Sequence, residues 1–107
     1  MTSEWDPRNV FDVFGDECAR RILALASEQP HSAESLAEHL TISQPTVYRR
    51  LDVLEDYDLI HEDNRVDESG HHYTAYETNI ESARFDVVDG EITIELTLTR
   101  DPLEPIE

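Results

Sequence analysis

The residues with the clearest chemical potential lie in the run SQPTVYRR, residues 43–50. The Gln44 amide can form two hydrogen bonds with the edge of an adenine base, and the Arg49 guanidinium can form two with guanine. The Thr46 methyl group can contact a thymine methyl. Ser43, at the start of the run, suits a phosphate if it lies at a helix N-terminus. Side chains of these types, so closely spaced, predict contacts with the bases and backbone of DNA.

A helix that begins at Ser43 would place these side chains together. Serine is a favoured N-cap, and Pro45 falls in the first turn, where the missing amide hydrogen costs little. Apolar residues recur at spacings of four and three, which predicts a buried stripe along a helix over residues 43–57. The stripe consists of Val47, Leu51 and Leu54, and the opposite face and its flanks present Gln44, Pro45, Thr46, Tyr48, Arg49 and Arg50.

Simpler interpretations exist for some of these side chains. Arg49 and Arg50 could form only a solvated face of the helix, and Tyr48 could be part of the core. Helix geometry directs Arg49 toward a major groove, whereas Arg50, on the flank, is expected to meet a phosphate.

The preceding segment predicts two further helices and a tight turn. Asp16 can cap a helix that ends before Pro30, because a residue before proline disfavours helical geometry. Ser32 is a good N-cap for a second helix, SAESLAEHL, and a three-residue connection at 41–43 follows it. A short apolar helix, or an apolar lead-in to the next helix, is also expected over residues 10–14.

Alternating runs at residues 59–66 and 71–78 flank the turn-forming segment DESG. This pattern predicts a β-hairpin with a four-residue loop. Arg65, His71 and His72 could reach a DNA backbone or minor groove from this hairpin, although Arg65 could instead pair only with neighbouring acids. Adjacent strand residues point to opposite faces, so the histidine pair is not expected to hold a metal.

A second hairpin is predicted by ARFDVV, DG and EITIELTLT. With a two-residue turn at DG, cross-strand pairing places apolar residues opposite each other on one face. That face consists of Phe85, Val87, Ile92 and Ile94, and Leu96 and Leu98 are expected to extend it past the end of the first strand.

Helix, turn, helix and β-hairpin in this order are typical of the winged helix-turn-helix fold. The run SQPTVYRRLDVLEDYDLI resembles the recognition helix of the ArsR-like regulators, FGDECARRIL resembles their first-helix phrase, and HHYTAYET resembles their second wing strand. The resemblance covers residues 10–79, about two thirds of the chain. It implies an α+β winged helix-turn-helix domain and a DNA-binding transcriptional regulator.

Three features depart from the family pattern. Asp58 stands where the family prefers glycine at the end of the helix. The paired cysteines of the metal-sensing members are missing from SAESLAEHL, so metal sensing is not expected. The family's C-terminal dimerisation helix is replaced by a hairpin at 85–99, which leaves the dimer surface open. Residues 10–14 and the Leu96/Leu98 extension are the candidates, or both pack within the chain.

The charge of the chain limits its partners and its solvent. It holds 25 acidic residues against 8 basic residues, all of them arginine, and its formal net charge is −17. Acidic excess without lysine resembles the proteins of extreme halophiles, of archaeal type. At about 1 M salt the Debye length is ~3 Å, so repulsion within such a chain is screened. Counterion release fades under these conditions, and we expect DNA binding to depend only weakly on salt.

Other classes of function lack support in the sequence. No apolar run is long enough to span a membrane, and a single cysteine, Cys18, excludes an internal disulfide, so a cytoplasmic location is expected. Cys18 is most simply a small core residue. No nucleophile–base grouping, glycine-rich loop or metal signature predicts an enzyme, and no residue set marks a cofactor or effector site.

The sequence therefore predicts a transcriptional regulator that binds double-stranded DNA as a homodimer. The recognition helix, residues 43–57, would enter the major groove, and a wing at residues 60–78 would lie on the backbone or minor groove. The alternative is a winged-helix module that binds another protein and does not bind DNA directly. The expected segments are a flexible arm at 1–9, the winged helix-turn-helix domain at 10–79, a hairpin extension for packing or dimerisation at 80–100, and a tail at 101–107.

Overall fold

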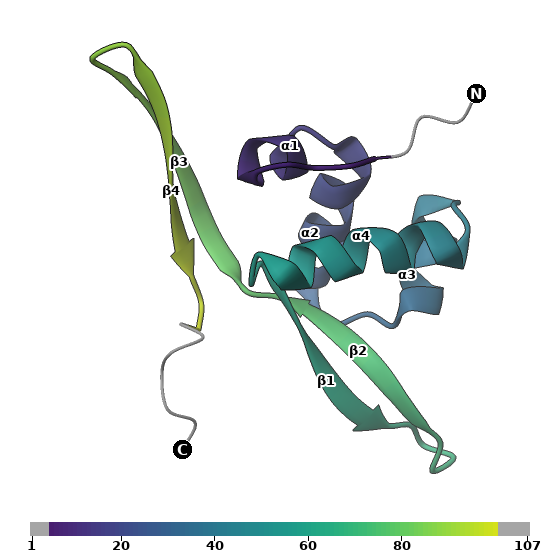
Figure 1. Cartoon of the computed structure of the whole chain (residues 1–107). Coiled ribbons are helices and arrows are strands. Elements are labelled where there is room, and N and C mark those ends of the chain that lie inside the picture. The colour runs from purple at the N-terminus through teal and green to yellow at the C-terminus, as the bar shows by residue number, and fades with distance from the viewer. Residues whose placement is uncertain (1–4, 101–107) are drawn as a thin grey trace, which may run out of the picture.

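The computed structural model describes residues 5–100, in which four helices precede four strands (Figure 1). The predicted tail, residues 101–107, and the first four residues of the predicted arm lie outside this range. The architecture is the expected α+β winged helix-turn-helix with an additional C-terminal hairpin. Its elements are α1 Val10–Phe14, α2 Glu17–Glu28, α3 Ala33–Leu40, α4 Gln44–Asp56, β1 Ile60–Val66, β2 His72–Thr78, β3 Ile80–Val88 and β4 Glu91–Leu98.

Each helix begins after a residue whose side chain caps it. Asp16, Ser32 and Ser43 accept backbone N–H bonds from the first turns of α2, α3 and α4, as predicted. Asn9 does the same for α1. These bonds satisfy amides that the first turn of a helix leaves without an intrahelical partner. The caps explain why the helices begin where the sequence predicts. In residues 5–100, no helix has both the length and the apolar character to cross a membrane.

The helices bury a small apolar core. Val47, Leu51 and Leu54 are fully buried, which confirms the predicted stripe of α4. Burying one leucine side chain contributes roughly 1.5–3 kcal/mol, so the stripe decides which face of α4 points outward. Cys18 packs at the edge of this core, and partial burial raises the pKa of its thiol.

The end of α4 and the start of the second hairpin are tied together by Asn79, which is only 5% exposed. Its Nδ2 donates to the carbonyls of Asp58 and Arg100, at 2.9 and 3.0 Å. Its Oδ1 accepts a 2.9 Å bond from the Arg100 amide. Asp58 has φ 60°, the left-handed conformation that glycine favours, and it ends the helix as expected. One buried side chain therefore joins the α4–β1 corner to both ends of the β3–β4 hairpin.

The wing, β1–β2, has a longer connection than the predicted four residues. Val66 pairs with His72, so residues 67–71 form the connection and His71 does not belong to the strand. The Asp67 amide donates to the His71 carbonyl at 2.9 Å, and Gly70 has φ 85°. A left-handed glycine after a tight turn forms a bulge, which adds the extra residue. Backbone bonds between His31 and Tyr76, of 3.1 and 2.7 Å, attach the wing to the segment between α2 and α3.

The second hairpin has the predicted turn and register. Asp89 and Gly90 both have positive φ, as a two-residue turn requires, and Val87 pairs with Ile92. The prediction that Leu96 and Leu98 extend past the first strand is wrong, because β3 begins at Ile80. Asn79 leads directly from β2 into β3, so Leu98 pairs with Ile80 and Leu96 with Ala83. An irregularity between Ile80 and Ser82 interrupts the alternation from which the strand would have been predicted.

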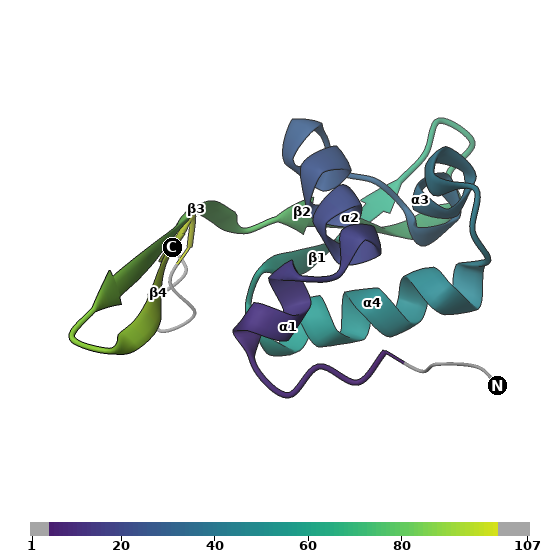
Figure 2. The ribbon, with the colours of Figure 1, turned by 90° about the horizontal axis from the view of Figure 1, so that it is seen from above.

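The two hairpins lie at opposite ends of the molecule. Figure 1 shows the wing leaving the helices in one direction and β3–β4 leaving in the other. The same separation is visible from above, where β3–β4 stands clear of the helical layer (Figure 2). Each hairpin is a two-stranded sheet of its own. A surface on β3–β4 is therefore remote from the α4–wing surface.

Candidate nucleic-acid interface

The N-terminal half of α4 presents a polar, accessible face. Ser43, Gln44, Pro45 and Arg49 are exposed, and Thr46 is half-buried. The Ser43 hydroxyl caps the helix and lies 2.9 Å from the Thr46 hydroxyl, so the start of the helix is locally ordered. Among the described residues, Arg49 forms no ion pair. Its guanidinium is available for an external acceptor.

A cleft of about 640 Å³ separates this half of α4 from the wing. Gln44 and Tyr48 line it from α4, and Tyr73 lines it from β2. Tyr48 is 47% exposed, so it does not belong to the core. The exposed Tyr73 was not predicted as a site residue, although its place in an alternating wing strand is a usable signal. Tyrosine hydroxyls on such a surface can bond to phosphate oxygens.

Arg50 does not lie on the accessible face, contrary to the expectation that it meets a phosphate. Its guanidinium donates to both carboxylate oxygens of Asp16, at 3.2 and 3.3 Å, and its side chain is only 13% exposed. The Trp5 ring covers it, with the guanidinium carbon 4.5 Å from the ring centroid. The flank of α4 that carries Arg50 faces the start of α2, where Asp16 already caps that helix. Arg50 therefore ties α4 to α2.

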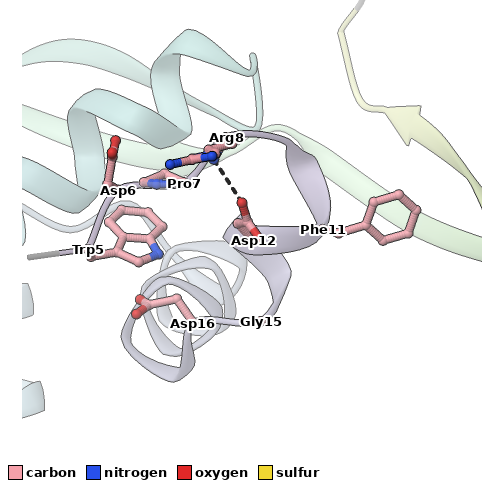
Figure 3. A pocket seen from close by; sticks show the side chains of 8 residues that line it. All are labelled: Trp5, Asp6, Pro7, Arg8, Phe11, Asp12, Gly15 and Asp16. Atoms are coloured by element: carbon pink, nitrogen blue, oxygen red, sulfur yellow. Dashed lines mark hydrogen bonds between the residues drawn. The ribbon is translucent and has the colours of Figure 1, made fainter. Parts of the chain in front are cut away.

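Trp5 was not predicted to have a role, and it anchors the described part of the N-terminal arm. Figure 3 shows its ring lying between the arm and Asp16. The arm is held further by a 2.8 Å bond from the Arg8 amide to Asp12. A lone tryptophan in a mostly polar arm is the sequence signal for such an anchor, because burying a large apolar ring stabilises the folded chain.

The wing candidates are exposed, and two of them have acidic partners. Arg65 donates to Asp63 at 3.1 Å, which fulfils the simpler interpretation without removing the side chain from the surface. The His71 ring lies 3.6 Å from the Asp67 carboxylate. His72 is exposed on the neighbouring strand position. Within residues 5–100, no three His, Cys, Asp or Glu side chains are grouped to hold a metal ion.

The C-terminal half of α4 is acidic. Asp52 and Asp56 are exposed, and Glu55 forms a hydrogen bond with Glu62 of β1. Burial, this bond and repulsion from Glu62 raise the pKa of Glu55 to about 7. Two carboxyl groups so close favour a shared proton over two negative charges. The face suited to a polyanion is therefore confined to residues 43–49.

The comparison with protein families agrees with this geometry. Residues 14–63 match the model of a family described as a helix-turn-helix domain. The chain carries a helix-turn-helix domain. The match covers α2, α3, α4 and the start of β1, which are the elements that position the polar face, and it supports a DNA-binding regulator. No curated protein matches the chain.

Proposed function

We propose that this protein is a sequence-specific transcriptional regulator that binds double-stranded DNA as a homodimer. The observation that carries the proposal is the exposed face at the start of α4, with Gln44, Pro45 and Arg49 accessible in a helix-turn-helix domain. The N-terminal residues of a recognition helix are those that meet base edges in the major groove. A cytoplasmic location is part of the same proposal.

The proposed contacts divide into base readers and backbone binders. Gln44 and Arg49 read base edges with two hydrogen bonds each, and Thr46 contacts a thymine methyl. Ser43, Pro45 and Tyr48 lie against the adjacent backbone. The wing adds Arg65, His71 and His72. It also adds Tyr73, which lines the same cleft as Gln44 and Tyr48. Arg50 is left out of this set because Asp16 holds it.

The homodimer follows from the size of this face. One short helical segment meets only a few base pairs, which gives little discrimination among genomic sites. Two copies that read half-sites about 34 Å apart double the number of base contacts. We therefore propose a pseudo-palindromic target.

We attribute the acidity of the chain to concentrated salt as its working solvent, as in halophilic archaea. A formal charge of −17 repels DNA in dilute buffer, but the Debye length of ~3 Å at about 1 M salt removes most of that repulsion. Affinity then rests on base contacts and shape. Arginine suits this role because its guanidinium is weakly hydrated and binds guanine through two hydrogen bonds.

The alternative function is a winged-helix module that binds a protein partner. Two observations favour it: Asp52 and Asp56 are exposed on α4, and Arg50 is paired internally. A basic protein surface would complement this acidic half of the helix.

Selection from random double-stranded DNA in about 1 M KCl tests the proposal. The expected result is enrichment of one motif with two-fold symmetry. A pool that stays random after repeated rounds would refute the proposed function and favour the protein-binding alternative.

A further inference from the structure

One face of the β3–β4 hairpin is apolar along its whole length and largely uncovered. We call this surface the hairpin face; it consists of Ala83, Phe85, Val87, Ile92, Ile94 and Leu96. Exposure is 51% for Phe85, 76% for Val87 and 61% for Ile92. Contiguous exposed apolar side chains of this size mark an interaction surface on a soluble protein.

The hairpin face carries no charged side chain, although the chain as a whole is strongly acidic. Alternation places the charged residues of β3 and β4 on the opposite face. There Arg84 bonds to Asp86 at 3.2 Å and to Glu95 at 3.4 Å. Covering the hairpin face therefore removes no charge from water. It also lets two acidic molecules meet where their carboxylates point away from each other.

The chain itself covers only the base of this hairpin. Leu96 and Leu98 pack against the core, and Phe11 of α1 contacts Phe85 with ring centroids 5.7 Å apart. The outer half projects beyond the helices (Figures 1 and 2). In the part of the chain that the structure describes, neither outer edge of this sheet pairs with another strand. A two-stranded hairpin alone is only marginally stable in water, so a partner that covers the outer half would stabilise it.

We propose that the hairpin face packs against the hairpin face of a second copy of this chain. This inference rests on the proposed function, because it names the surface that forms the regulator's homodimer. A two-fold interface buries the same patch of each copy, so one apolar, uncharged face is sufficient for both. The wing and the N-terminal half of α4 lie away from this hairpin and stay free for DNA (Figure 1). DNA itself is a poor occupant, since the face offers neither positive charge nor donors.

The test replaces Val87 with glutamate and measures molar mass by light scattering in about 1 M KCl. Wild-type protein is expected at twice the chain mass of 12.3 kDa. The Val87→Glu variant is expected to raise the dimer dissociation constant about a hundredfold, because it buries an unpaired carboxylate in the interface. Adding Ile92→Glu should give a monomer. Both side chains are exposed in one copy, so the fold of the monomer is retained.

Val88→Glu is the matched control. Val88 is the next residue, is 59% exposed and lies on the opposite face of the same strand. This variant should stay dimeric, and circular dichroism should show all three variants folded. A monomeric wild type overturns the inference. That result is expected if a protein other than this chain normally covers the hairpin face. Equal mass for the Val87 and Val88 variants also overturns it.

The two experiments distinguish failure of the hairpin interface from failure of the proposed DNA-binding function. A dimer that Val87→Glu dissociates, but that selects no DNA motif, would refute the regulator and leave the interface intact. A monomeric wild type that still selects a half-site motif would refute the interface and leave the DNA-binding role intact.

Discussion

Arg49 and Arg50 are neighbours on α4, but they lie in different surroundings. Arg49 is exposed and has no ion-pair partner among the described residues. Arg50 lies under the Trp5 ring with its guanidinium on Asp16. A rotation of about 100° per residue around the helix separates the two side chains, so one faces solvent and the other faces α2.

Replacing Arg49 and Arg50 with alanine, one at a time, should have opposite effects on DNA affinity and on stability. Arg49→Ala should lower specific DNA affinity about tenfold to a hundredfold, the value of one two-bonded base contact, with unchanged unfolding free energy. Arg50→Ala should leave affinity nearly unchanged but destabilise the fold by about 2 kcal/mol, because Asp16 loses its partner. Fluorescence anisotropy and urea denaturation measure the two effects. Equal losses of affinity would contradict the assigned roles.

The raised pKa of Glu55 predicts that the free energy of unfolding depends on pH. Its folded-state pKa of about 7 lies above the ordinary value of 4.5, so the folded chain retains a proton that the unfolded chain has lost between these values. The free energy of unfolding should therefore fall as pH rises from about 4.5 through 7. Urea denaturation at about pH 5 and pH 8 measures this, and Glu55→Gln should weaken the dependence. Parallel profiles for wild type and variant would contradict the role of Glu55.

At the scale of elements, the decisive contact is the junction at Asn79. The wing and the second hairpin are separate sheets with one residue between them, and nothing in their own ladders sets their relative direction. Asn79 does so by bonding to Asp58 at the end of α4 and to Arg100 after β4. The hairpin is thereby directed away from the wing and the exposed face of α4 (Figure 1).

Asn79→Ala should destabilise the protein by about 2–3 kcal/mol, because the three hydrogen bonds of this buried side chain to Asp58 and Arg100 would be lost. Asn64→Ala is the control, since Asn64 is exposed on the wing and should change stability by less than about 0.5 kcal/mol. Thermal unfolding followed by circular dichroism compares the two. Similar melting temperatures for both variants would show that the junction does not depend on this side chain.

At the scale of the whole molecule, the distribution of charge leads to a prediction about the proposed DNA binding. On the side proposed to face DNA, the described residues with positive charge are Arg49 and the partly paired Arg65, beside exposed Asp52 and Asp56. Few phosphates can be neutralised, so few counterions are released on binding.

The logarithm of DNA affinity should therefore fall with the logarithm of salt at a slope of about −4 or shallower for the dimer, because each subunit neutralises at most about two phosphates. Anisotropy titrations across a range of KCl concentrations give the slope. A slope near −10, as for a repressor with many phosphate contacts, would exclude the proposed mode of binding.

The sequence alone determined the features that depend on near neighbours in the chain. The caps at Asp16, Ser32 and Ser43, the buried stripe of α4 and the pairing around Asp89-Gly90 follow from local hydrogen bonds and apolar periodicity. These interactions span few residues, so short patterns predict them.

Only the tertiary structure decided the features that join distant segments. The Arg50–Asp16 pair spans 34 residues, and Asn79, just before β3, bonds to Asp58 and Arg100, each 21 residues away. Packing of the whole chain decides whether a flanking arginine meets a phosphate or a carboxylate. It also decides which half of an apolar hairpin is left uncovered. No periodicity in the sequence encodes that packing, because it arises from contacts that exist only once the helices have assembled.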